Sequence, residues 1–100
     1  MDYQIKNKKI LLVGCTGVIG SEFTDHLYKN GGILILVDLN SKKFESFKKY
    51  YPKAFFIKCD VTKEENVIRL KNKIKKKFKK LDSVIYNVGL TSSMSKKSKL

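Results

Sequence analysis

Three glycines and one aspartate are the residues of this chain best suited to hold a phosphate-containing ligand. Gly14, Gly17 and Gly20 come directly after an apolar run, residues 9–13, and an amphipathic segment follows them. Glycines at a strand-to-helix junction let backbone N–H groups approach a pyrophosphate, and the start of the helix adds partial positive charge. Asp38 ends the next apolar run, where a carboxylate can accept hydrogen bonds from both ribose hydroxyls. This pattern predicts a dinucleotide site.

A simpler interpretation of Asp38 is that it begins a turn, because Asp-Leu-Asn-Ser also suits turns and helix caps. The glycine loop upstream favours the ribose-binding role. A negative charge at residue 38 would repel a 2′-phosphate, so NAD is expected over NADP. Lys42 and Lys43 follow closely and could soften that preference.

The rest of the chain alternates between strand and helix patterns. Four apolar segments predict strands at residues 9–13, 33–38, 54–59 and 83–88. Between them we expect three helices, of which the first covers about residues 17–29 and has Ile19, Phe23 and Leu27 spaced four apart on one face. Parallel pairing with right-handed crossovers gives the strand order 3-2-1-4. The predicted fold is a Rossmann-like three-layer α/β/α arrangement with a partial parallel sheet.

The second and third helices carry start signals of their own. Asn40 or Ser41 is expected to cap the second helix, which Pro52 ends. Thr62 and Glu65 are expected to form a capping box at the start of the third. The predicted apolar face of the second helix is Phe44, Phe47 and Tyr51; that of the third is Val67, Leu70, Ile74, Phe78 and Leu81.

Four motifs, taken in their order along the chain, resemble those of the short-chain dehydrogenase/reductase family. After the glycine loop and Asp38 come residues 59–61, Cys-Asp-Val, and residues 86–89, Tyr-Asn-Val-Gly. The last motif is similar to the family's Asn-Asn-Ala-Gly, and the resemblance covers about residues 7–89. It departs from the family at Val13, where threonine is usual. The Gly14-Gly17-Gly20 spacing resembles the extended members, such as sugar-nucleotide epimerases.

The resemblance implies roles for individual residues. Asp60 would bond the adenine amino group, and Val61 would pack beside the ring. Asn87 would steady the central sheet, Val88 would add bulk beside the ribose, and Gly89 would let the chain pass close to the cofactor. The complete set expected to bind the cofactor is Gly14, Thr16, Gly17, Val18, Ile19, Gly20, Asp38, Leu39, Asp60, Val61, Asn87, Val88 and Gly89.

No catalytic residue is assigned. The family's catalysis implies a Tyr-x-x-x-Lys pair, in which tyrosine is the general acid/base and lysine lowers its pKa. Four positions after the five tyrosines stand Asn7, Gly32, Ala54, Phe55 and Leu90. We therefore expect residues 1–89 to be the N-terminal portion of an NAD(P)-binding domain, truncated before its active site and inactive alone. Its substrate would be an alcohol or carbonyl compound, with a sugar as one option.

Two other functions stay open from the residues alone. The chain could be a decayed remnant without independent activity, with an exposed fourth strand that favours self-association. The net charge of +13 also permits a nucleic-acid-binding module, although Arg69 is the only arginine among 22 basic residues. Arginine is the better residue for bidentate recognition, so nucleic acid is the least favoured partner.

Composition and the two ends of the sequence predict the cellular location of the protein. A charged N-terminus, apolar runs of strand length only, and no metal-ligand spacing predict a soluble, cytoplasmic protein with no metal site or membrane segment. Cys15 and Cys59 should end strands too far apart for a disulfide. Residues 90–100 are rich in serine and lysine and are expected to be a disordered tail. Its end, Ser98-Lys99-Leu100, matches the peroxisomal address of eukaryotes.

Overall fold

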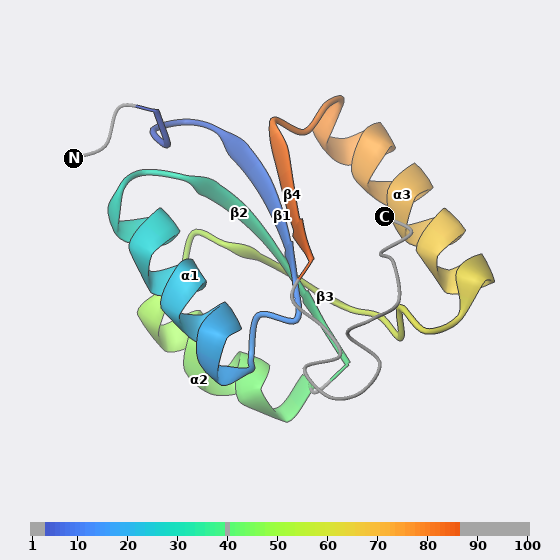
Figure 1. Ribbon diagram of the computed structural model, residues 1–100, viewed down its shortest axis with the longest axis horizontal. Helices are drawn as coiled ribbons and strands as arrows, with labels where there is room; N and C mark the ends of the chain where they lie inside the picture. Colours follow the sequence, from blue (N-terminus) through green and yellow to red (C-terminus); the bar gives the residue numbers. More distant parts are fainter. Residues whose placement is uncertain (1–3, 40, 87–100) are drawn as a thin grey trace.

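Four parallel strands form the centre of the computed structural model, which describes residues 4–39 and 41–86 (Figure 1). They are β1 (Lys9–Val13), β2 (Ile33–Asp38), β3 (Phe55–Lys58) and β4 (Ser83–Tyr86). Their order is β3-β2-β1-β4, with every pair parallel. The predicted fold class and strand order are confirmed. The expected end of the fourth strand and the expected tail, residues 87–100, lie outside the described residues.

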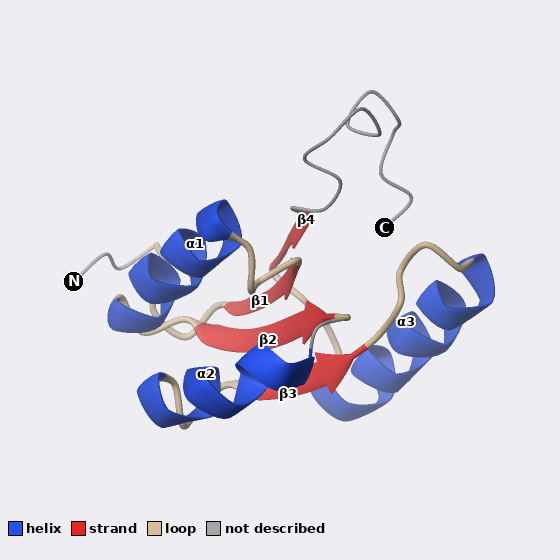
Figure 2. Ribbon diagram, turned by 90° about the horizontal axis from the view of Figure 1, so that it is seen from below, coloured by secondary structure: helices blue, strands red, loops and turns tan. Residues whose placement is uncertain are grey.

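Helices cover both faces of this sheet (Figure 2). The helices α1 (Val18–Lys29) and α2 (Phe44–Tyr50) lie on one face, with a 3-10 turn at Ser41–Lys43 leading into α2. The longest helix, α3 (Glu64–Phe78), lies alone on the other face. Within the described ranges, no helix has both the length and the apolar character to cross a membrane.

The sheet is buried because β1 and β2 are apolar on both faces. Alternate side chains of these strands divide between two clusters, as period-two geometry requires. On the α1/α2 face the cluster comprises Ile10, Leu12, Cys15, Leu27, Leu34, Leu36 and Phe44. On the α3 face it comprises Leu11, Val13, Ile35, Val37, Leu70, Ile74 and Phe78. Each fully buried aliphatic side chain contributes about 1.5–3 kcal/mol of transfer free energy.

The buried face of α1 differs from the one that its apolar spacing predicts. Ile19 and Phe23 are 46% and 42% exposed, whereas Gly20, Thr24 and Leu27 are buried. A Cβ atom at residue 20 would lie 2.0 Å from the Gly14 carbonyl oxygen, so only glycine allows α1 to approach β1 here. The Thr24 hydroxyl donates to the Gly20 carbonyl at 2.8 Å and is satisfied without water. Backbone proximity, rather than side-chain hydrophobicity, selects this face.

The predicted helix starts are also corrected. The capping box is wrong, because α3 begins after Lys63 without a side-chain cap and the Thr62 hydroxyl donates to Asp60 instead. With Lys63 as the N-cap, Glu65 is the second residue of α3 and not the third that a capping box needs, while the Asx-type turn at Asp60 holds Thr62 outside the helix. The helix α2 has Lys43 as its N-cap, also without a side-chain hydrogen bond, and the candidate cap Asn40 lies outside the described residues. The apolar stripe of α3 is confirmed from Val67 to Phe78, and Leu81 packs beside it as a partly buried residue.

We predict opposite outcomes for alanine at two glycines of the loop. Gly20→Ala should destabilise the fold by at least about 3 kcal/mol, because its methyl group meets backbone rather than a mobile side chain. Gly17→Ala is the control, since its Cβ has 3.9 Å of clearance, and should cost no more than about 1 kcal/mol. Urea unfolding followed by circular dichroism measures both. Equal losses of stability would contradict this packing.

Candidate dinucleotide-binding site

The carboxyl ends of the parallel strands gather the predicted site residues at one edge of the sheet. Val13 lies opposite Val37 in β2 and Tyr86 in β4, so the segments that follow these strands are neighbours. The Gly14 N–H group donates to the Val37 carbonyl at 2.8 Å, which ties the glycine loop to the end of β2. This edge is where open parallel sheets bind ligands.

The glycine loop presents the start of α1 without a side-chain cap. Gly14 has φ = 85°, a conformation that favours glycine, and turns the chain out of β1. Gly17 is the N-cap and makes no side-chain cap hydrogen bond. Val18 and Ile19 form the exposed first turn, 76% and 46% accessible. Uncapped N–H groups at a helix start are ready donors to an anion, and the helix dipole adds to that attraction.

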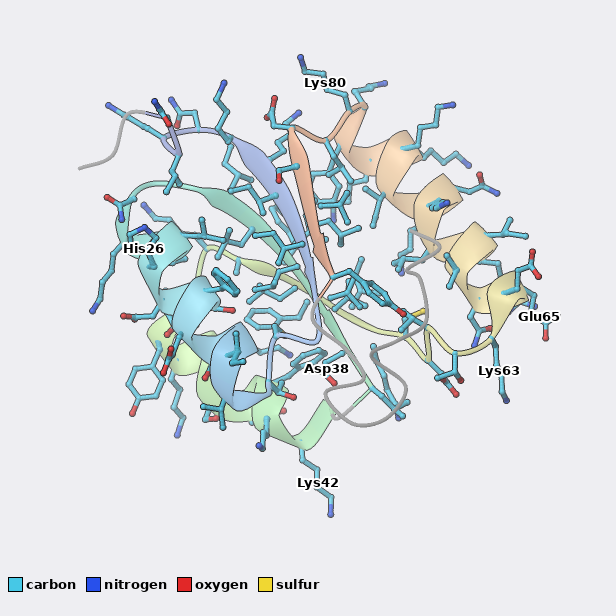
Figure 3. The ribbon with its side chains drawn as sticks, viewed as in Figure 1. His26, Asp38, Lys42, Lys63, Glu65 and Lys80 are labelled. Atoms are coloured by element: carbon cyan, nitrogen blue, oxygen red, sulfur yellow. The ribbon has the colours of Figure 1, made fainter. Side chains whose placement is uncertain are left out.

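Asp38 is bonded directly to this loop. Its Oδ2 atom accepts the Thr16 backbone N–H at 2.9 Å and the Thr16 hydroxyl at 2.7 Å. Its Oδ1 atom accepts the Leu39 N–H at 2.7 Å. The Lys43 ammonium donates to the Thr16 carbonyl at 3.4 Å. Figure 3 shows the labelled Asp38 beside the loop that joins β1 to α1, so the carboxylate and the helix start form one surface.

A second group of predicted residues lines a neighbouring cavity of about 460 Å³. Leu39 and Asp60 both reach it, at the ends of β2 and β3. Asp60 accepts the Thr62 hydroxyl and backbone N–H, and these bonds lower the pKa of its exposed carboxyl. The full lining is Leu39, Ile57, Lys58, Cys59, Asp60, Asn66, Arg69, Leu70 and Lys73.

Not every predicted residue joins these two groups. Val61 packs against the apolar cluster below α3 and lines a different hollow with Thr62 and Glu64. Asn87, Val88 and Gly89 lie outside the described residues. Sequence reasoning missed Arg69 and Lys73 at the cavity, because helix spacing alone does not reveal which flank of α3 faces β3.

The Thr16–Asp38 pair was not foreseen either. Its 22-residue separation gives no local signal, although both residues were predicted to bind the cofactor. The Lys43 contact with Thr16 depends on the path between β2 and α2, which composition does not specify. The first contact links the loop to the end of β2, and the second links it to the 3-10 turn before α2.

Both cysteines are free thiols, as predicted. Cys15 is fully buried, and burial, with the nearby charge of Asp38, raises its pKa to about 12. Cys59 is partly exposed, and burial with the charge of Asp60 also raises its pKa. The described residues contain no group of three or more His, Cys, Asp or Glu side chains placed to hold a metal.

Comparison with known proteins identifies the family. The sequence profile of the short chain dehydrogenases matches residues 8–100. The chain belongs to the short-chain dehydrogenase family. It is similar to 3-hydroxyacyl-CoA dehydrogenase type-2 of Drosophila melanogaster, with 33% identity over 91 residues. It is also similar to L-fucose dehydrogenase of Bos taurus, with 25% identity over 89 residues.

This short-chain dehydrogenase chain matches only part of its relatives. The fly and bovine alignments cover 90% and 89% of the chain but 36% and 33% of those enzymes. A solved glucose/ribitol-type short-chain dehydrogenase from Brucella melitensis superposes with a TM-score of 0.80 at 21% identity. That superposition covers 93% of this chain and 40% of the other. The fold is therefore that of the family, over about a third of its usual length.

Thiol reactivity provides a direct check on the glycine loop of this short-chain dehydrogenase chain. With a pKa of about 12 and no exposure, Cys15 should stay unreactive toward Ellman's reagent at pH 8, while Cys59 reacts slowly. In Cys59→Ser, the native protein should release no thionitrobenzoate and the urea-unfolded protein one equivalent. Rapid native reaction of the Cys59→Ser variant would contradict the burial of Cys15.

The Thr16 hydroxyl should stabilise the loop. Thr16→Val removes a 2.7 Å hydrogen bond to a carboxylate while keeping the side-chain shape, and should lower the free energy of unfolding by about 1–2 kcal/mol. Thr16→Ser keeps the hydroxyl and should recover most of that loss. Thermal unfolding of the three proteins measures the effect, and unchanged stability in Thr16→Val would argue against the bond.

Proposed function

We propose that this chain is the cofactor-binding part of an NAD-dependent short-chain oxidoreductase. The observation that carries the proposal is the bonding of Asp38 to the glycine loop, which places a ribose acceptor beside an uncapped helix start. Members of the family use NAD or NADP. The choice between the two depends on Asp38 and the lysines near it.

The residues fit the phosphate portion of a dinucleotide. The Gly20–Gly14 contact leaves no room for a side chain between the loop and α1, so the loop backbone stays close to the ligand. The N–H groups at the start of α1 would donate to phosphate oxygens, and Val18 and Ile19 would shield that side from water. None of these roles needs a metal.

The residues also fit the adenosine portion. Asp38 would accept hydrogen bonds from the ribose, while Leu39 and Asp60 would contact the adenine from the cavity at the ends of β2 and β3. Arg69 and Lys73 line the same cavity and would face the electron-rich ring. We propose that Val61 contributes by packing below this cavity, and that Asn87, Val88 and Gly89 act as the family resemblance implies.

NAD is the proposed cofactor because a second negative charge beside Asp38 is unfavourable. A 2′-phosphate would approach a carboxylate that Leu39 and Thr16 already hold in place. Lys43 offsets part of that repulsion, but its ammonium is turned toward the Thr16 carbonyl. The cofactor would supply hydride chemistry toward an alcohol or carbonyl compound only together with catalytic residues that this chain does not provide.

Catalysis is proposed to require residues that this sequence does not supply. The relatives include enzymes named for a hydroxyacyl-CoA, a sugar and farnesol, so the substrate of this chain is proposed only as an alcohol or carbonyl. We propose that the chain alone binds the cofactor and does not transfer hydride. Self-association through β4 and nucleic-acid binding remain predictions.

Isothermal titration of the folded chain tests the proposal. NADH should give saturable heat, and NADPH should bind more weakly. The absence of heat at millimolar NADH would overturn the binding claim. NADPH binding tighter than NADH binding would overturn the proposed preference while leaving the dinucleotide site intact.

The charge of Asp38 should set the cofactor preference. Asp38→Asn keeps the shape but loses the carboxylate, so NADH should bind about tenfold more weakly, equivalent to about 1.4 kcal/mol. NADPH should lose less affinity or gain some, because the repulsion of its 2′-phosphate disappears. Glu45→Gln removes the same charge from an exposed position on α2 and should change neither affinity. Equal effects of the two substitutions would contradict the role of Asp38.

A further inference from the structure

The two buried threonines of the described part of the chain differ in what their hydroxyl groups bond. Thr24 is fully buried, and its hydroxyl donates to the Gly20 carbonyl four residues earlier in the same helix. Thr16 is 9% exposed, and its hydroxyl donates at 2.7 Å to the Asp38 carboxylate at the end of β2. A buried hydroxyl needs a partner, but an acceptor in its own helix meets that need. The bond from Thr16 to a charged group on another element is therefore more than burial requires.

The backbone that carries Thr16 is itself held in place. The Gly14 N–H group donates to the Val37 carbonyl at 2.8 Å, and Cys15 is fully buried in the apolar cluster under α1 and α2. The Lys43 ammonium donates to the Thr16 carbonyl at 3.4 Å. A residue that positions another must be fixed by its own surroundings, and Thr16 meets this condition.

The bonds from Thr16 set the direction of the Asp38 carboxylate relative to the start of α1. Oδ2 of Asp38 accepts both the backbone N–H and the hydroxyl of Thr16, at 2.9 and 2.7 Å. Oδ1 accepts the Leu39 N–H, but Leu39 is the next residue, so this bond moves with the end of β2. Thr16 belongs to the loop before α1, and hydrogen bonds to a carboxylate are about twice as strong as neutral ones. The hydroxyl thus fixes the carboxylate against the glycine loop.

A fixed carboxylate affects the two candidate cofactors differently. A ribose 2′-hydroxyl gains from an acceptor that is already aligned, because the Asp38 side chain loses no further freedom on binding. A 2′-phosphate is repelled unless the carboxylate turns away, and the Thr16 hydroxyl opposes that turn. The hydroxyl also screens part of the carboxylate charge. The field of a dipole falls faster with distance than that of a charge, so the positioning effect is the larger one.

We propose that Thr16 is a positioning residue that sets the preference of the site for NAD over NADP through Asp38. This inference rests on the proposed function, because it concerns the ribose end of the same site. Without the Thr16 hydroxyl, Asp38 keeps its charge but loses its fixed direction. The loop backbone serves the pyrophosphate that both cofactors share, whereas the Thr16 side chain acts only where the two cofactors differ.

Isothermal titration of the intact chain with NADH and with NADPH tests this role. The quantity measured is the dissociation constant of NADPH divided by that of NADH. Thr16→Val should lower this ratio about fivefold, mainly by weakening NADH, and Thr16→Ser should keep it within about twofold. Both titrations use one preparation of each variant, so partial unfolding lowers the stoichiometry of binding and leaves the ratio unchanged.

Two further variants separate positioning from general loosening of the fold. Thr24→Val removes the other buried threonine hydroxyl, which bonds within α1, and should keep the ratio within about twofold even if stability falls. In the Asp38→Asn background, adding Thr16→Val should change the ratio less than about twofold, because no carboxylate charge is left to direct. Circular dichroism checks that each variant is folded.

Four results would overturn the inference, and the last of them is distinct from the others. Equal weakening of NADH and NADPH by Thr16→Val would make its hydroxyl merely structural. An equal fall of the ratio in Thr24→Val would show a general loosening of α1. A full fivefold effect of Thr16→Val in the Asp38→Asn background would mean that Thr16 does not act through Asp38. No heat from NADH with the unsubstituted chain would overturn the proposed function itself, and this inference with it.

Discussion

The close approach of α1 to β1 determines the geometry of everything at the carboxyl edge of the sheet. With 2.0 Å between an ideal Cβ at residue 20 and the Gly14 carbonyl oxygen, the helix can lie here only because residue 20 is glycine. This contact fixes the start of α1 against the end of β1. It also brings Thr16 to Asp38, 22 residues later, where the backbone and hydroxyl of Thr16 share one carboxylate oxygen. The loop and the end of β2 thus behave as one unit, and its shape is set before any ligand binds.

Polar groups and apolar side chains occupy different parts of the sheet. At the carboxyl edge, the fold exposes the helix start of α1, the Asp38 carboxylate and a cavity with Leu39 and Asp60 at its wall. On the face that α3 covers, the apolar side chains reach as far as the half-exposed Val84. After Glu64 and Glu65 at its start, α3 carries basic side chains and no acidic ones. The two regions differ in chemistry, with backbone donors and a carboxylate at the first and apolar side chains beside lysines at the second. Substitutions in one region are therefore expected to leave the other unchanged.

The fold was largely predictable because its strands are uninterrupted apolar runs bounded by glycine, aspartate and charged residues. β1 and β2 have the expected bounds, and the parallel order follows from the alternation of strands with helices. The buried face of α1 was not predictable from hydrophobicity, since a backbone contact at Gly20 outweighs the apolar side chains of Ile19 and Phe23. The capping box was wrong because α3 begins one residue later than the pattern indicates, with Lys63 as its N-cap and Thr62 held in a turn by Asp60. Among the site residues, Gly14 and Asp38 could be identified from spacing, whereas the Thr16–Asp38 bond depends on tertiary geometry.

The central claim is that the glycine loop, the end of β2 and the cavity beside β3 together bind one dinucleotide. Amide chemical shifts of the nitrogen-15-labelled chain during titration with NADH test this most directly. We expect the largest shifts on Gly17, Ile19, Leu39 and Asp60, with one common dissociation constant, while the amides of Lys75 and Lys79 stay unchanged. Shifts concentrated on the lysine-rich end of α3, or no shifts at millimolar NADH, would contradict it.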